Sequence, residues 1–121
     1  MNPTSICSSI LNVQHALLTL GDPTGAIYKE VCDVFLDDLP RMTQLLNDSF
    51  DDASLVPVLH ELANSLCAIG ALNSGERLRS LEIQARKGAF IDRMVMVMEV
   101  VDILDSVEKA VKKWKDLEGA W

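Results

Sequence analysis

Apolar residues recur at intervals of three and four along most of this chain, and few turn residues interrupt them. That interval is the period of an α-helix that buries one face. The main interruptions are Gly21-Asp22-Pro23, Asp51-Asp52, the segment from Gly70 to Gly75, and Gly88. The pattern therefore predicts an all-α fold whose helices are joined by short turns.

The first two predicted helices lie before residue 50. A stripe of apolar residues predicts a short N-terminal helix: Ile6, Ile10, Val13, Leu17 and Leu20. The second helix carries an apolar stripe from Ile27 to Leu46, with Asp22 as its N-cap and Pro23 in its first turn. Pro40 lies inside that stripe, so we expect a kink or a local break there.

Three further helices are predicted after residue 53. Ser54 is expected to cap a helix that runs to about Ala71, and the next runs from about Gly75 to Lys87 and stops at Gly88. The last runs from about Phe90 to about Leu117. Its expected seam is Met94, Val97, Val101, Leu104, Val111 and Trp114. The valine-rich segment Met94 to Val101 resembles a strand, but the helical period continues on both sides of it.

Four long helices with short connections favour an antiparallel four-helix bundle with an additional N-terminal helix. An open helical array is the alternative, which tight turns disfavour. The 121 residues match the usual length of one domain, so residues 1–121 are expected to form a single helical unit.

Charge and cysteine content restrict the function. The net charge is -7, which argues against a general nucleic-acid binder and against an anionic membrane surface as partner. Cys7, Cys32 and Cys67 are odd in number and contain no CxxC pair, so we expect neither a disulfide framework nor a metal site. Reduced thiols, no signal-peptide pattern and no long apolar run favour a cytoplasmic location.

The helix predicted from Ser54 to Ala71 carries an unusual histidine. On a helical wheel, His60 falls almost opposite the apolar cluster and so points away from the core. Its expected neighbours on the outward face are small or apolar residues: Val56, Ala63, Asn64, Cys67 and Ala71. A titratable group in such a weakly charged patch predicts a docking surface for another protein. His15 has no comparable surroundings.

The run from His60 to Ala71 resembles the phosphorylation-site helix of histidine-containing phosphotransfer (HPt) domains. In that motif a histidine precedes any residue, then Leu, Lys, Gly and Ser, and Leu-Gly-Ala closes the helix. The residues that match or nearly match are Leu62, Ser65, Ile69, Gly70 and Ala71. The segments Leu81 to Gly88 and Val34 to Pro40 are similar to the helices that flank this one in the family, and the whole resemblance covers about residues 22 to 117.

Two residues depart from the family motif. Ala63 stands where the family has a lysine, and Asn64 where it has a glycine. The lysine supplies positive charge beside the phosphoryl group, and the glycine leaves room beside the imidazole, because residues four apart share a helix face. Their loss is expected to slow transfer or to change which partner fits, although Asn64 could donate a hydrogen bond to a phosphoryl oxygen. By this reasoning, restoring lysine and glycine should speed transfer.

In an antiparallel hairpin that turns near residues 72–73, the residue level with His60 lies near position 85. Glu82 and Arg86 flank that position, as residues at these places do in the family. We therefore expect Glu82 to orient the ring and Arg86 to replace part of the missing lysine charge. The alternative is an ordinary Glu–Arg pair at helical spacing. The segment from Gly75 to Lys87 is also richer in basic than in acidic residues, which predicts a basic edge beside His60.

The resemblance implies a phosphocarrier rather than a stand-alone enzyme. His60 would accept a phosphoryl group from an aspartate of a receiver domain, in a response regulator or a hybrid histidine kinase, and pass it to another receiver. No cofactor of its own is expected, because the Mg²⁺ belongs to the receiver. The alternatives are an HPt-like module that docks without transferring phosphate, and a plain helical adaptor or oligomerisation bundle. The run Met94 to Met98 also leaves room for a homodimer.

Overall fold

The computed structural model describes residues 10–49, 51–88 and 92–119, and the regular structure in these ranges is entirely helical. The helices are α2 (Val13–Leu20), α3 (Ala26–Asp48), α4 (Asp52–Ala68), α5 (Leu72–Arg86) and α6 (Arg93–Gly119). The prediction of an all-α fold is confirmed for this part of the chain, and residues 94–101 are helical. Ile6, expected in the first helix, lies outside the described residues.

The start of α3 differs from the prediction. Gly25, in the left-handed conformation at φ +80°, is the N-cap, and the helix begins at Ala26, so the expected N-cap at Asp22 is wrong. Asp22 nevertheless serves the first turn from the preceding loop. Its buried carboxylate accepts a 2.8 Å hydrogen bond from the backbone N–H of Tyr28. The helix continues through Pro40, so no break occurs there.

The start of α4 lies slightly earlier than predicted. Asp51 is the N-cap, and its side chain accepts a 2.7 Å hydrogen bond from the backbone N–H of Ser54, the residue predicted to be the cap. Capping geometry explains the difference, because an N-cap carboxylate bonds the N–H group three residues later. Both Asp51 and Ser54 are capping residue types, so the sequence alone does not decide between them.

The turn between α4 and α5 is anchored from two directions. Gly70 has φ +88°, and its carbonyl oxygen accepts a 2.8 Å hydrogen bond from the N–H of Asn12. The Tyr28 hydroxyl donates a 2.6 Å bond to the carbonyl of Ile69. A Cβ on Gly70 would lie 2.5 Å from the Asn12 carbonyl oxygen, so only glycine fits here. The next helix then begins at Leu72, which leaves Gly75 inside α5 instead of at its start.

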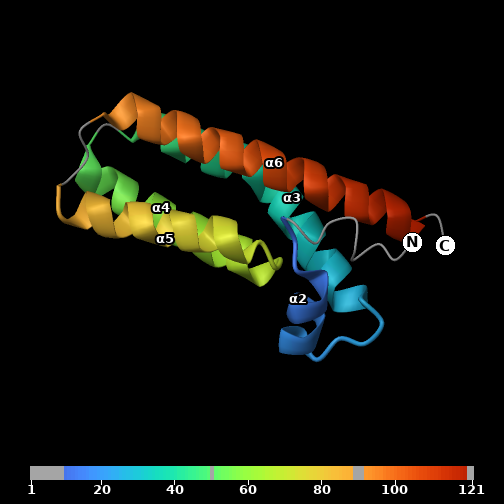
Figure 1. The fold of residues 1–121 in the computed structure, drawn as a ribbon. Helices are drawn as coiled ribbons and strands as arrows, with labels where there is room; N and C mark the ends of the chain where they lie inside the picture. Colours follow the sequence, from blue (N-terminus) through green and yellow to red (C-terminus); the bar gives the residue numbers. More distant parts are fainter. Residues whose placement is uncertain (1–9, 50, 89–91, 120–121) are drawn as a thin grey trace.

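Figure 1 shows α4 and α5 side by side as an antiparallel hairpin, with α6 running antiparallel along α3. The first of these pairs packs on the second through α3 and α4, and α2 packs against α3. A bidentate ion pair between Arg77 of α5 and Glu99 of α6 links the two pairs on another side. No helix in the described ranges is both long enough and apolar enough to span a bilayer.

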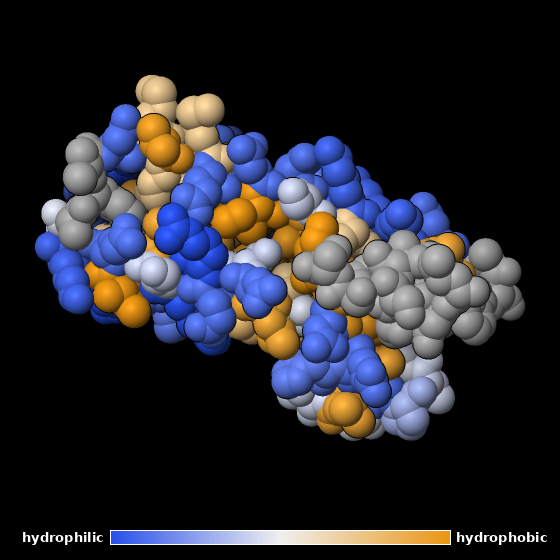
Figure 2. Space-filling view, in the orientation of Figure 1, coloured by the Kyte–Doolittle hydropathy of each residue, from blue (hydrophilic) through white to orange (hydrophobic). Residues whose placement is uncertain are grey.

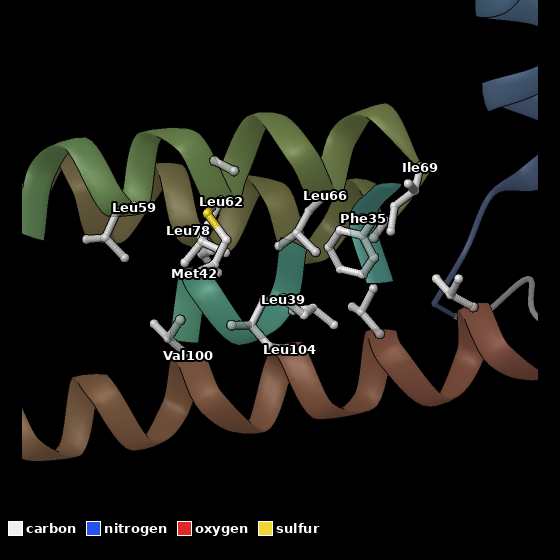
Figure 3. Packing of buried hydrophobic residues seen from close by; sticks show 14 of the residues in the cluster. Phe35, Leu39, Met42, Leu59, Leu62, Leu66, Ile69, Leu78, Val100 and Leu104 are labelled. Carbon is white, nitrogen blue, oxygen red and sulfur yellow. The ribbon is translucent and has the colours of Figure 1, made fainter. Parts of the chain in front are cut away.

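The core lies between α3, α4, α5 and α6. Figure 3 shows Phe35 and Met42 of α3 directed toward Leu62 and Leu66 of α4. Tyr28 and Trp114, both buried, meet edge to face with ring centroids 4.9 Å apart and so join the start of α3 to the end of α6. These contacts enclose a continuous apolar interior of the kind that drives folding.

The predicted seam of α6 is correct only in part. Leu104, Val111 and Trp114 are buried, but Met94 is 73% exposed, and Val97 and Val101 are half-buried. The N-terminal half of α6 instead buries Met96 and Val100. Because nearly every residue from 94 to 101 is apolar, the sequence did not distinguish the inner from the outer face. The apolar side chains left outside gather over the beginning of α6 (Figure 2).

Candidate functional site

His60 lies in the middle of α4 with its side chain 60% exposed, as predicted from the helical wheel. Its Nδ1 atom is 3.0 Å from Oε1 of Glu82 on α5. The hairpin therefore brings together two residues that are 22 positions apart. The ring is fixed on one side by this contact and faces solvent elsewhere.

Glu82 is the buried member of the cluster, with only 10% of its side chain exposed. Arg86, one turn further along α5, places Nε at 3.0 Å and Nη2 at 2.8 Å from Oε2 of Glu82. Burial raises the pKa of the Glu82 carboxyl, but the hydrogen bonds from Arg86 and His60 outweigh burial and hold the pKa below its ordinary value. Glu82 is therefore a carboxylate at neutral pH.

The charge state of Glu82 determines the tautomer of His60. A carboxylate only accepts hydrogen bonds, so Nδ1 of a neutral His60 must carry the proton and donate it to Glu82. In that tautomer the lone pair of the ring lies on Nε2, the nitrogen that Glu82 does not contact. When the ring is neutral, the arrangement therefore presents an oriented nitrogen lone pair at the protein surface. The predicted contact between Glu82 and His60 is confirmed, whereas Arg86 contacts Glu82 and not the ring.

The predicted docking residues around His60 are partly wrong. Asn64 is exposed one turn after His60, and Val56 and Cys67 are half-buried, but Ala63 and Ala71 are 1% and 0% exposed. Ala71 also lies beyond the end of α4. The two buried alanines cannot belong to a partner-docking surface.

Gly75 of α5 explains the error. Its missing side chain leaves space that Cys67 fills, and a Cβ there would collide with Sγ of Cys67 and lie 3.3 Å from the carbonyl oxygen of Ala63. The small residues of α4 therefore mark close packing of α4 on α5. The outward face is rotated toward α3, and its further exposed residues are Ala53, Ser54, Pro57, Glu61 and Ala68. The glycine at position 75 was the available signal, but the prediction placed it at the start of the helix.

On the α3 side of His60, ion pairs connect α3 to α4. Arg41 forms a bidentate pair with Asp38, at 2.7 and 2.8 Å, and its Nη2 atom is 2.6 Å from Oε1 of Glu61. The pKa of the Asp38 carboxyl is lowered, first by the hydrogen bond from Arg41. Because Glu61 directly follows His60, this cluster borders the histidine on the side opposite Glu82. Sequence reasoning missed it, because the register of α3 against α4, unlike that of a hairpin with a short turn, cannot be derived from the sequence pattern.

The predicted basic edge on α5 is largely neutralised. Arg77 pairs with Glu99, Arg79 with Glu76 at 2.9 Å, and Arg86 with Glu82. Lys87 is the remaining exposed cation of that segment, and no ion pair joins it to another described residue. The excess of positive residues counted from the sequence therefore does not appear as free charge beside His60.

No cluster of three or more potential metal-ligating side chains occurs in the ranges that the structure describes. The thiols there are those of Cys32 and Cys67. Burial raises the pKa of the Cys32 thiol to about 11, so it stays protonated and unreactive. The hydrogen-bonding partner of His60 in the described ranges is Glu82 and not a thiol.

Comparison of the chain with protein-family models, with curated proteins and with solved structures found no match in any of the three. The geometry around His60 therefore carries the functional argument.

Proposed function

We propose that this protein is a phosphorelay intermediate of the HPt type, in which His60 carries the phosphoryl group. The observation that supports it best is the contact of His60 Nδ1 with the buried, ionised Glu82, which leaves Nε2 exposed as a nucleophile. Arg86 offsets the cost of burying Glu82 through Oε2, and the other oxygen, Oε1, is the one that contacts His60 and orients the ring.

The proposed chemistry requires little from this chain. Nε2 of His60 attacks the phosphorus of an aspartyl phosphate, so an N–P bond forms while the bond from phosphorus to the aspartyl oxygen breaks. The ring, still protonated on Nδ1, becomes positively charged, and the Glu82 carboxylate stabilises that charge. A second receiver aspartate then takes the phosphoryl group by the reverse exchange. Positioning and electrostatics dominate this class of reaction, and the receiver supplies the Mg²⁺.

In this proposal α3, α4, α5 and α6 form the four-helix bundle of an HPt domain, and α2 is the additional N-terminal helix. The partner is a receiver domain of a response regulator or hybrid kinase in the cytoplasm. It would contact the exposed face of α4 around Pro57, Asn64 and Ala68. The shallow apolar groove between α3 and α4, which includes Val34 and Phe35, adjoins that face.

A second candidate is an HPt-like module that docks on a receiver without transferring phosphate. Ala63, in place of the family's lysine, carries no charge, and Arg86 is already engaged by Glu82, so neither supplies free positive charge next to His60. The docking surface would remain, but phosphoryl transfer would be slow. A plain helical adaptor remains the third alternative, and in that case His60 would have no role.

The test is transfer from a phosphorylated receiver or hybrid kinase of the same organism, followed by measuring an acid-labile, base-stable label on this protein. We expect label on the wild type and none on His60→Ala. His15→Ala is the matched control, because the chain has two histidines and both are exposed. Label that persists in His60→Ala would overturn the proposal.

A chemical test addresses the nitrogen directly. Phosphoramidate phosphorylates accessible imidazoles without a partner protein, and ³¹P NMR distinguishes the two phosphohistidine isomers. We expect the Nε2 isomer at His60, since Nδ1 is held by Glu82. The Nδ1 isomer at His60 would contradict the assigned tautomer. Retained receiver binding without any transfer would favour the second candidate.

A further inference from the structure

The charges around His60 are nearly balanced, and Arg41 is one of the two cations that neutralise the carboxylates there. Two guanidinium groups, Arg41 and Arg86, face three carboxylates, Asp38, Glu61 and Glu82. The cluster beside His60 therefore carries one net negative charge. The other residues exposed on the same face of α4 are uncharged: Ala53, Ser54, Pro57, Asn64 and Ala68.

We infer that Arg41 is a specificity-determining residue for an anionic phosphoryl donor at His60. This inference rests on the proposed function. Arg41 engages Asp38 through two hydrogen bonds and Glu61 through a third, and its own side chain is 50% exposed. Without it, two carboxylates, one of them on the residue that follows His60, would lie uncompensated on the α3 side of α4.

The physical reason is the sign of the charge on both partners. An aspartyl phosphate is anionic, and it approaches a protein whose net charge is already -7. Like charges at the edge of an interface slow association and raise the free energy of the complex. Glu82 does not add to the problem, because it is buried and paired with Arg86, whereas Asp38 and Glu61 are exposed.

A neutralising role for Arg41 predicts a different result from a purely structural role. As a link between α3 and α4, Arg41 would act through the ion pair itself, so restoring the charge with Glu61→Gln would not restore the rate. As a neutralising charge, it should act on the second-order rate of phosphoryl transfer. That effect should be large at about 0.01 M salt, where the Debye length is about 30 Å, and should nearly vanish at 1 M, where it is about 3 Å.

The experiment compares four proteins in transfer from a phosphorylated receiver at low and high salt. Relative to the wild type, Arg41→Gln should lower the second-order rate at low salt about two- to fourfold, as expected for one unit charge within roughly 10 Å. The double variant Arg41→Gln with Glu61→Gln restores the wild-type charge without restoring the ion pair, and it should recover the rate.

Lys109→Gln is the matched control. It also removes one positive charge and leaves the partner Asp105 unpaired, but it lies on α6, away from α4. It should leave transfer unchanged. A loss in Arg41→Gln that persists at 1 M salt and is not recovered by Glu61→Gln would overturn the inference, as would an unchanged rate. A wild type that takes no label from any receiver would mean instead that the proposed function has failed, and this inference with it.

Discussion

Gly75 of α5 lies directly against Cys67 of α4, so closely that a single added methyl group would collide with the sulfur. This contact sets the distance between the two helices that carry His60 and Glu82. It also turns Ala63 into the interface, and Ala63 is fully buried there. The geometry of the candidate site therefore depends on a residue without a side chain.

Gly75→Ala should destabilise the protein despite the higher helix propensity of alanine. Overpacking costs about 1–3 kcal/mol, and the gain in propensity returns up to about 1 kcal/mol. We expect a net loss of about 1 kcal/mol in the free energy of unfolding, measured by urea denaturation.

The background Cys67→Ala supplies the control for this prediction. With the sulfur removed, the loss caused by Gly75→Ala should become smaller, because only the 3.3 Å approach to the Ala63 carbonyl oxygen then opposes the gain in helix propensity. The coupling between the two substitutions then measures the contact itself. An equal loss in both backgrounds would show that the α4–α5 spacing does not depend on this contact.

The same contact explains how far the sequence could predict the site. The period of α4 was sufficient to place His60 outside, and the hairpin geometry was sufficient to place Glu82 beside it. The remaining outward face was rotated wrongly, because small residues indicate either a flat docking surface or a close helix crossing. The choice between them depends on which residue of α5 faces Ala63 and Cys67, and a helical wheel of α4 alone does not contain that information.

Ala63→Lys should therefore be harmful, contrary to what the family motif indicates. The sequence suggested that lysine here, with glycine at Asn64, would speed transfer. Since Ala63 is 1% exposed, a lysine side chain at this position must either push α5 away from α4 or leave the interface, so that its aliphatic stem is no longer buried. We expect a lower melting temperature and a weaker contact between His60 and Glu82. Asn64→Gly, at an exposed position, should cost only about 0.3 kcal/mol from helix propensity, because asparagine is itself a poor helix former. A stable Ala63→Lys variant with faster transfer would contradict the observed packing.

Tyr28→Phe should reveal how strongly the α4–α5 turn is anchored. The substitution removes the hydroxyl that donates to the buried carbonyl of Ile69 while keeping the ring against Trp114. An acceptor left without this donor costs about 1–2 kcal/mol. We expect a loss of that size in thermal or chemical unfolding, with the near-UV signal of Trp114 retained. Hydrogen exchange near Gly70 should rise in the variant, and unchanged exchange there would argue against the anchor.

Helix ends show a second limit of the sequence. Asp22, Asp51 and Ser54 are all capping residue types, and each takes part in a capping contact, but the two predicted N-caps, Asp22 and Ser54, are not the residues that occupy the cap positions. Asp22 bonds Tyr28 from a loop that Gly25 closes, so the helix begins three residues later than Pro23 indicates. Capping types identify the neighbourhood of a helix start. The residue at which the helix begins depends on the conformation of the whole loop.

Glu82 should make stability depend on pH in the acidic range. Its pKa is lowered in the folded protein, so the folded state binds the proton less tightly than the unfolded state does. The stabilisation is therefore fully present at neutral pH and is lost as the pH falls below the ordinary glutamate value of about 4.3.

Glu82→Gln should reduce stability by about 1 kcal/mol at pH 7, a modest value because Arg86 and His60 are largely exposed. Its difference from the wild type should shrink between pH 5 and pH 3, as measured by urea unfolding. A difference that stays constant over that range would mean that Glu82 is not held ionised by its partners.

The tautomer of His60 gives the sharpest test of the site, because it requires no partner. Near pH 8, ¹⁵N chemical shifts of the wild type should show the proton of His60 on Nδ1, as the contact with the Glu82 carboxylate requires. Glu82→Ala removes the acceptor, so His60 should shift toward the mixture of tautomers of a free imidazole. His15, which is exposed and distant in sequence from Glu82, serves as the internal reference and should not change. If His60 in the wild type carried its proton on Nε2, the nitrogen proposed to attack phosphorus would have no lone pair to offer, and the function proposed for this surface would lose its chemical basis.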